Sequence, residues 1–172
     1  MCSTLENHLS LGIPSEANTA LHTDAARKSR VAPVTTTVGR HKTENYMPSL
    51  ETLERFIARI EQNAHAEAIE EFYASNASMQ ENQSAPRVGR DFLVANERKT
   101  LARTKSVQSQ CARPIFQNGN HVVIRWIFDV EWKDNSKTHI EELAYQRWEG
   151  ELLAEEQFFY DPAQFVPRKP AE

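Results

Sequence analysis

The most regular hydrophobic pattern in the chain lies at residues 122–132. Every even position in this segment is apolar, whereas the odd positions include charged residues. Alternation with a period of two is typical of a strand that has one face in the core and the other in water. The apolar set consists of Val122, Ile124, Trp126, Phe128, Val130 and Trp132. Strands are also expected near 105–116, 138–148 and 152–160, with short turns between them.

Apolar residues that precede these strands recur at helical spacing instead. Residues 49–62 form one such segment, which predicts an amphipathic helix with Ser49 as its N-cap. Further helices are expected at 65–74 and at 92–103, the latter capped by Asp91, with a short strand at 77–81 between them. Three helices followed by a meander of four long strands predict an α+β fold with a curved antiparallel sheet.

Composition divides the chain into three parts. Residues 1–46 are rich in Thr, Ser and Ala and contain no aromatic residue before Tyr46, so we expect a disordered leader or extension there. Residues 47–165 carry all the periodic segments and should form a single domain. Residues 166–172 contain two prolines and should be an irregular tail.

Charge and cysteine content narrow the class of protein. The 172 residues carry a formal net charge of −4, which does not suit a general nucleic-acid binder, and no apolar run is long enough to span a membrane. The two cysteines, Cys2 and Cys111, have no disulfide or zinc-type spacing, and a reducing cytoplasmic location fits them best; Cys111 should be a buried thiol. No cofactor or metal motif is present, so we expect no cofactor and no metal.

Several segments together resemble a known family. These segments are 63–74, 77–82, 87–90, 144–150 and 155–162, and their order and spacing resemble the nuclear transport factor 2-like superfamily in its SnoaL-like, polyketide cyclase-like branch. The resemblance covers roughly 49–162. It implies a cystatin-like cone, in which the bent sheet and the helices enclose a pocket. Members include ketosteroid isomerase, polyketide cyclases, epoxide hydrolases and scytalone dehydratase, while others only bind a ligand or dimerise, commonly through the outer face of the sheet.

The resemblance also singles out a candidate catalytic carboxylate. Glu81 matches the position at which the isomerases carry their general base, and an apolar pocket would raise its pKa toward the range of a working base. The alternative is a solvated position at the rim. The oxyanion-hole positions of the isomerases fall near Ile57 and at Ala144, which donate no hydrogen bond, so ketosteroid isomerase chemistry is not expected. Scytalone dehydratase needs histidines in its pocket, whereas His65, His121 and His139 are expected at the surface.

Strand parity yields further candidates, and it leaves two registers open. If Ala144 faces inward, so do the second candidate carboxylate Glu142, the amide Gln146 and Trp148. The same alignment turns Glu155, Gln157 and Phe159 inward on the last strand. The opposite register exposes these three and buries Phe158 and Tyr160 instead, because a slip of one residue reverses every assignment. The alternative for all four glutamates, Glu141, Glu142, Glu155 and Glu156, is a solvated charged face.

The predicted function follows from this set of residues. Glu81 would act as general base, and Glu142 or Gln146 would orient or protonate the substrate. The expected substrate-binding residues are Phe72, Tyr73, Met79, Trp126, Phe128, Glu155, Gln157 and Phe159, although each aromatic residue also reads as structural core. An aromatic pocket with few polar groups suits a hydrophobic small molecule. We expect a homodimer with Trp132 and Trp148 near its surface; the alternative is a non-catalytic ligand-binding or dimerisation module.

Overall fold

The structure is a computed structural model, and it describes residues 46–166. These residues correspond to the domain expected at 47–165. The expected leader, apart from residue 46, and the expected tail beyond residue 166 lie outside the described residues. No helix within the described part is both long and apolar enough to cross a membrane.

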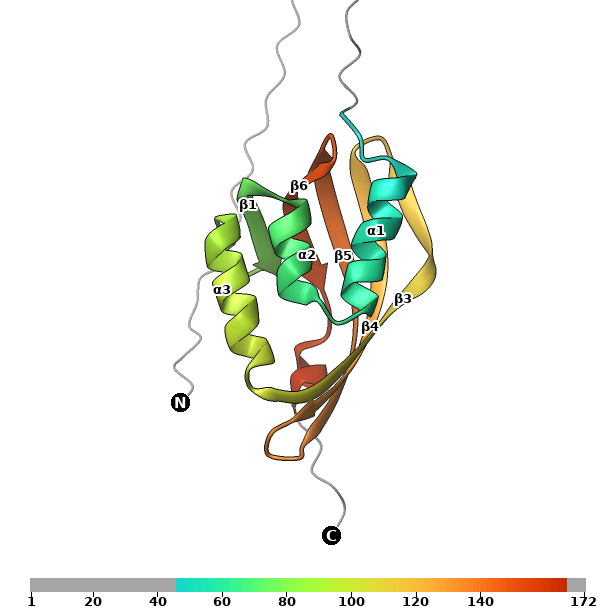
Figure 1. The fold of residues 1–172 in the computed structure, drawn as a ribbon. Helices are drawn as coiled ribbons and strands as arrows, with labels where there is room; N and C mark the ends of the chain where they lie inside the picture. Colours follow the sequence, from blue (N-terminus) through green and yellow to red (C-terminus); the bar gives the residue numbers. More distant parts are fainter. Residues whose placement is uncertain (1–45, 167–172) are drawn as a thin grey trace, which may run out of the picture. The chain divides into compact units, whose positions relative to one another are not determined.

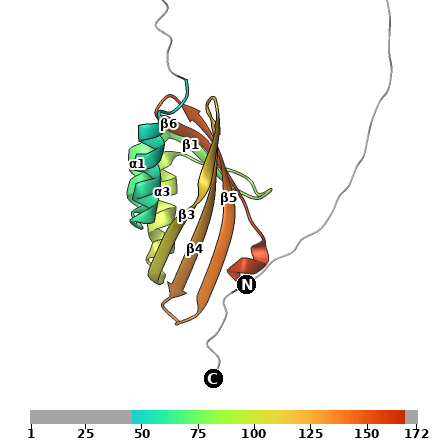
Figure 2. The same ribbon diagram turned by 90° about the vertical axis from the view of Figure 1, so that its right-hand side faces the viewer.

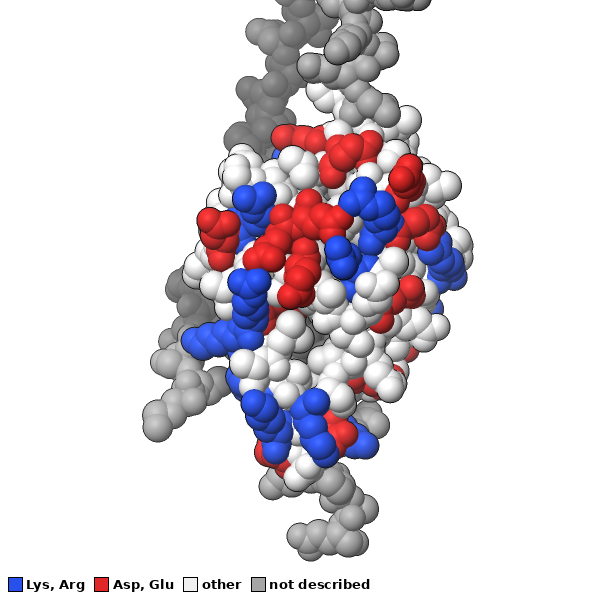
Figure 3. Space-filling model, in the orientation of Figure 1, with Lys and Arg blue, Asp and Glu red and all other residues white. Residues whose placement is uncertain are grey.

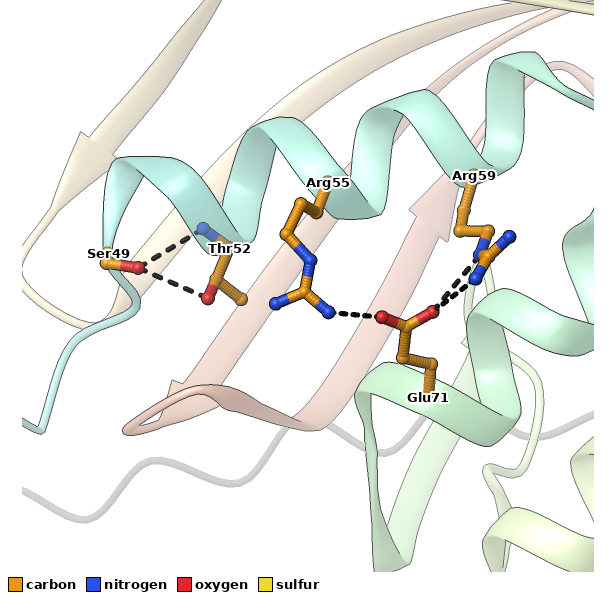
Figure 4. Close-up of polar contacts among 5 residues, drawn as sticks. All are labelled: Ser49, Thr52, Arg55, Arg59 and Glu71. Carbon is orange, nitrogen blue, oxygen red and sulfur yellow. Dashed lines mark hydrogen bonds and ion pairs between the residues drawn. The ribbon is translucent and has the colours of Figure 1, made fainter.

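Three helices form where the helical spacing predicted them. They are α1 (Leu50–Glu61), α2 (His65–Phe72) and α3 (Arg90–Leu101). The Ser49 hydroxyl oxygen accepts a hydrogen bond from the Thr52 amide at 3.1 Å, which confirms the predicted cap of α1 (Figure 4). The predicted cap of α3 is wrong, because Gly89 at a φ of 103° precedes the helix and Asp91 lies in its first turn.

A six-stranded sheet forms the other layer of the domain. Its strands are β1 (Tyr73–Glu81), β2 (Arg87–Val88), β3 (Thr104–Asn118), β4 (His121–Trp132), β5 (Lys137–Glu149) and β6 (Leu152–Phe159), and a short 3-10 helix, η1 (Pro162–Phe165), follows. The order is β2-β1-β6-β5-β4-β3. The predicted antiparallel meander of β3 to β6 is confirmed, but β1 pairs in parallel with β6, so the sheet is mixed.

The helices all lie on one face of the sheet. Figures 1 and 2 show α1, α2 and α3 packed side by side on the same side of the curved strands. Two arginines of α1, Arg55 and Arg59, both pair with Glu71 of α2, which ties these helices together (Figure 4). None of these three α-helices lies on the opposite face of the sheet (Figure 2).

The core fills the space between the two layers. The ring of Phe56 on α1 meets Trp126 and Trp148 edge to face, with centroids 6.4 and 5.8 Å apart. The even positions of β4 face this core or the adjoining cavity, as predicted. Trp148 is fully buried, so its expected place near a dimer surface is wrong. Cys111 is buried as expected, and burial raises its pKa.

The helix-bearing face carries charges of both signs. Figure 3 shows acidic and basic side chains beside one another over the helices. Some of them form ion pairs, such as Arg98 with Glu70 at 2.7 Å. The basic residues Arg98 and Lys105 therefore have acidic partners, as is typical of a solvated surface.

Candidate functional site

A cavity of about 400 Å³ lies between the helices and the concave face of the sheet. Side chains from all three helices, from the strands and from η1 line it. Most of the wall is apolar or aromatic, as is common in small-molecule sites. The larger members are Phe56, Ile60, Ile69, Tyr73, Met79, Trp126, Phe128, Trp132, Phe158, Tyr160 and Phe165.

Four carboxyl groups from four different elements also line this cavity. They are Glu81 on β1, Glu97 on α3, Glu142 on β5 and Glu156 on β6. Only Arg87, among the described lining residues, is a lysine or an arginine. The sequence places these acids 14 to 75 positions apart, so the fold alone brings them together.

Glu81 sits at the end of β1, beside Arg87 of β2. The Arg87 guanidinium donates a hydrogen bond from Nη2 to Glu81 Oε1 at 2.7 Å, and each side chain is 31% exposed. Glu81 therefore contacts the cavity, but as an ion pair rather than as the desolvated carboxylate that we expected. The Nε of Arg87 is buried and has no partner within the described residues.

Glu156 lies deepest among the four acids and is 3% exposed. Gln146 Nε2 donates to its Oε1 at 2.7 Å, and the Tyr73 hydroxyl donates to its Oε2. Trp148 Nε1 in turn donates to Gln146 Oε1 at 3.0 Å, which fixes the orientation of the amide. Burial raises the pKa of Glu156 to about 7, although its two hydrogen bonds act in the opposite direction.

Glu142 faces inward, as the parity of β5 predicted, and contrasts with Glu156. None of the hydrogen bonds or ion pairs found in the described chain involves its carboxyl group, and it is half-buried. Burial first, and then the charges of Glu81, Glu156 and Glu97, raise its pKa to about 8. At neutral pH this carboxyl group therefore holds its proton.

The predicted orientation of β6 is wrong, and a β-bulge explains the error. Trp148 pairs with Leu153, but the preceding residue Arg147 pairs with Glu155, so Ala154 is an extra residue in β6. A regular ladder would place Glu155 opposite the inward-facing Gln146. The bulge instead places Glu156 there and reverses the parity of the rest of the strand.

The three residues that were expected to face inward on β6 consequently lie elsewhere. Glu155 is exposed and forms an ion pair with Arg147 at 2.7 Å. Gln157 donates through its side chain to the carbonyl of Asn82 at 2.8 Å, and Phe159 is 40% exposed. The alternative register, with Phe158 and Tyr160 at the cavity, is the one observed.

Two more placements differ from expectation. Phe72 packs in the core against Phe56 and under the guanidinium of Arg55, and it does not line the cavity. His65 does line the cavity, although a surface position was expected. Its Nε2 lies 2.8 Å from the Ser109 hydroxyl and its Nδ1 lies 3.3 Å from Glu97 Oε1.

The remaining expected residues are where the sequence placed them, and others were missed. Tyr73, Met79, Trp126 and Phe128 line the cavity, while Gln146 lies behind Glu156. His121 and His139 lie on strands outside the cavity lining. The missed lining residues include Arg87, Asn96, Glu97, Thr100 and Phe165, whereas Glu156 and Tyr160 belonged to the alternatives that strand parity left open. The weak apolar period of α3 offered no signal for its contribution.

The described residues hold no group of three or more His, Cys, Asp or Glu side chains arranged to bind a metal ion. Tyr160 has a raised pKa of about 12, because of burial and of the charge and hydrogen bonding of Glu81. The site therefore combines proton donors and acceptors with an apolar wall. This arrangement can exchange protons with a bound molecule.

The sequence matches no family model, and no curated protein sequence is similar to it. Solved structures do share its fold. A protein from Catenulispora acidiphila with a ketosteroid isomerase-like fold, in complex with trimethylamine, is 17% identical, with a TM-score of 0.59 over 69% of this chain and 91% of that one. A candidate SnoaL-like polyketide cyclase from Mesorhizobium loti is 19% identical, with a TM-score of 0.55 over 64% and 97%.

An LEH-like epoxide hydrolase from M. tuberculosis is 10% identical, with a TM-score of 0.56 over 66% of this chain and 83% of that one. All three matches cover about two thirds of this chain and most of the other. At these identities the likeness concerns the fold, and activity does not follow from it. The domain has the nuclear transport factor 2-like α+β fold, in the form found in SnoaL-like and ketosteroid isomerase-like proteins.

Proposed function

We propose that the cavity binds a small, largely hydrophobic molecule and catalyses cofactor-free acid/base chemistry on it, of the isomerase, lyase or cyclase type. The observation that carries this proposal is Glu142, a carboxyl group with a pKa of about 8 in an aromatic cavity that also contains Glu81. A group that holds its proton at neutral pH can donate it. A second carboxyl group beside it supplies the acceptor.

The roles follow from the contacts of each group. Glu81 is the proposed general base, since Arg87 provides a cationic partner for its carboxylate at 2.7 Å. Glu142 is the proposed general acid. Gln146 does not reach the cavity lining, so we assign it a positioning role through its hydrogen bond to Glu156. Tyr73, Met79, Trp126 and Phe128 would hold the apolar body of the substrate.

The structural neighbours support this class of function in general terms. One protein of the same fold is in complex with trimethylamine, and another is an epoxide hydrolase. Cavities of this fold therefore accept small molecules, and some of them perform chemistry. The oxyanion-hole positions of the isomerases remain unsuitable here, because Ile57 and Ala144 are buried apolar residues.

A second candidate function, a non-catalytic dimerisation module, has its own supporting observation. The outer face of the sheet exposes Phe116, Leu143, Tyr145 and Phe159 by 65, 46, 45 and 40%. Leu143 pairs with Phe159 across the ladder, so these two form a continuous apolar surface. We propose a homodimer through this face; it is compatible with catalysis inside the cavity.

An assay of the turnover of a simple probe distinguishes acid/base catalysis from the non-catalytic module. The flat aromatic compound 5-nitrobenzisoxazole reacts when a base removes its ring proton, whereupon the nitrogen–oxygen bond breaks and a coloured phenolate forms. We expect saturable turnover, and Glu81→Gln should lower kcat/KM by about 100-fold or more, the usual contribution of a general base. Glu141→Gln, on the outer face, is the matched control. Equal rates for wild type and Glu81→Gln would remove Glu81 as the base, and binding without turnover would favour the non-catalytic module.

A further inference from the structure

The cavity wall contains more acidic than basic side chains. Four carboxyl groups face it, while its only lysine or arginine within the described residues is Arg87. Arg87 is already paired with Glu81 at 2.7 Å, and its buried Nε has no hydrogen-bond partner among the described residues. The single guanidinium is thus committed to one acid.

Glu97 also has a partner in the wall. His65 Nδ1 lies 3.3 Å from Glu97 Oε1, while the other ring nitrogen is held by the Ser109 hydroxyl. Glu97 and Glu81 are therefore the two acids with neighbours able to carry positive charge. The other two acids have none.

Glu142 and Glu156 form the uncompensated pair. Glu156 receives hydrogen bonds only from two neutral groups, the Tyr73 hydroxyl and the Gln146 amide. Glu142 receives none from the described chain, and the charge of Glu156 is among the causes that hold its proton in place. The other titratable groups around this pair are Glu81, Glu97, Tyr160 and Tyr73, and none of them is cationic.

Aromatic faces lie in the same cavity. Trp126 and Phe128 are stacked with ring centroids 6.0 Å apart, and Tyr73, Trp132 and Tyr160 contribute further rings. Aromatic rings attract organic cations electrostatically, most strongly where water is excluded, and quaternary ammonium groups are recognised in this way. Carboxylates add a charge of the complementary sign.

We propose that the molecule bound in this cavity is an organic amine, whose ammonium group lies by Glu142 and Glu156 and whose apolar body lies against the aromatic wall. A neutral hydrophobic ligand would leave the uncompensated pair as it is. An anion would meet these two acids, while the single arginine of the wall is already paired with Glu81. An ammonium group beside Glu142 favours the ionised form of this carboxyl group and takes the place of the proton that it holds in the free protein. This inference rests on the proposed small-molecule binding and adds the chemical class of the ligand.

Two probes of equal shape and unequal charge test the inference. Benzyltrimethylammonium is a permanent cation, and 2,2-dimethylpropylbenzene replaces its nitrogen with carbon. Binding to the full chain is followed by intrinsic tryptophan fluorescence, since Trp126 and Trp132 line the cavity. At pH 8.5 we expect the cation to bind about tenfold more tightly than the neutral probe or tighter.

The pH dependence provides a second readout that requires no variant. Because the cation does not titrate, its affinity should rise about tenfold between pH 6 and pH 8.5 as the acids lose their protons. The neutral probe should show no such rise. Glu142→Gln should weaken cation binding about tenfold and flatten the pH profile, whereas Glu141→Gln on the outer face should change neither.

Different outcomes would contradict the amine inference alone or the proposed small-molecule binding as well. If the neutral probe binds as tightly as the cation at pH 8.5, or if phenylacetate binds more tightly than both, the cavity is a small-molecule site but the ligand is not an amine. If no probe perturbs the tryptophans, the proposed small-molecule binding fails together with this inference. A pH-independent cation affinity that Glu142→Gln leaves unchanged would also overturn it.

Discussion

Two pairs of adjacent glutamates show how strongly the two faces of one sheet differ. Glu141 and Glu155 point outward, where hydrogen bonds from Arg125 and Arg147 lower their pKa values. Their chain neighbours Glu142 and Glu156 point into the cavity, where burial raises the pKa to about 8 and about 7. The residue type is the same and the separation is one position, so the surroundings alone make the difference.

This contrast shows that the carboxyl groups with raised pKa values lie on the inner face of the sheet. An exposed carboxylate with an arginine partner stays ionised at neutral pH and contributes little beyond solubility. A buried carboxyl group without a cationic partner keeps its proton to a higher pH, so it can act as a proton donor. The inner face of the curved sheet therefore has chemical properties that its outer face lacks, although both faces carry glutamates.

The largest effect on stability should come from removing a side chain that packs on the inner face of the sheet. Trp148→Ala should lower the free energy of unfolding by about 4 kcal/mol, because a fully buried ring against Phe56 is lost and a cavity remains. Tyr145→Ala, on the outer face, should cost less than about 1 kcal/mol in the monomer. Urea denaturation at low protein concentration measures both, and equal losses would contradict the assignment of the two faces.

The next effect concerns pH. Because folding raises the pKa of Glu142 from 4.5 to about 8, the folded protein binds this proton more tightly than the unfolded chain does. Its contribution to the free energy of unfolding therefore falls as pH rises from about 4.5 to 8. Glu142→Gln removes this loss. The free energy of unfolding of the variant should therefore be higher than that of wild type by on the order of 3 kcal/mol at pH 9, and the two should be equal near pH 4.

The outer neighbour provides the control for this titration. The pKa of Glu141 is lowered by Arg125, so any stability that it contributes is lost at low pH rather than at high pH. Glu141→Gln should leave the free energy of unfolding at pH 9 nearly unchanged. A comparable gain in both variants would show that net charge, rather than burial of Glu142, governs the effect.

The smallest effect should come from one hydrogen bond on the inner face. The Tyr73 hydroxyl stabilises ionised Glu156, so Tyr73→Phe should raise the pKa of Glu156 above its value of about 7. The expected rise is about one unit, equivalent to about 1.4 kcal/mol. Carbon-13 NMR titration of labelled glutamate carboxyls measures it. The exposed tyrosine variant Tyr145→Phe should leave the Glu156 titration where it is; a Tyr73→Phe titration that does not move would contradict the network.

Much of the fold follows from local patterns. The alternation at 122–132 identifies β4 and its inner face, and the helical spacing at 49–62 identifies α1 with its Ser49 cap. Both are long amphipathic segments, in which each residue repeats the same preference for core or water. The parity of β5 likewise places Glu142 and Gln146 inward.

The errors occur where a local pattern is interrupted or absent. One extra residue, Ala154, reverses the parity of β6 and puts Glu156 into the cavity in place of Glu155. The parallel pairing of β1 with β6 joins segments that are more than seventy residues apart, and no short-range pattern signals it. His65 reaches the cavity only because α2 begins next to Ser109 of β3.

Hydrophobic periodicity determined the type of each long element and which of its faces is buried, because that preference is local and repeated. Which residues line the cavity was decided by the tertiary structure. Glu81, Glu97, Glu142 and Glu156 come from four elements, and the raised pKa values of Glu142 and Glu156 arise from burial and from the neighbouring acids once those elements pack. A carboxyl group's chemistry depends on its surroundings, and those surroundings exist only in the folded chain.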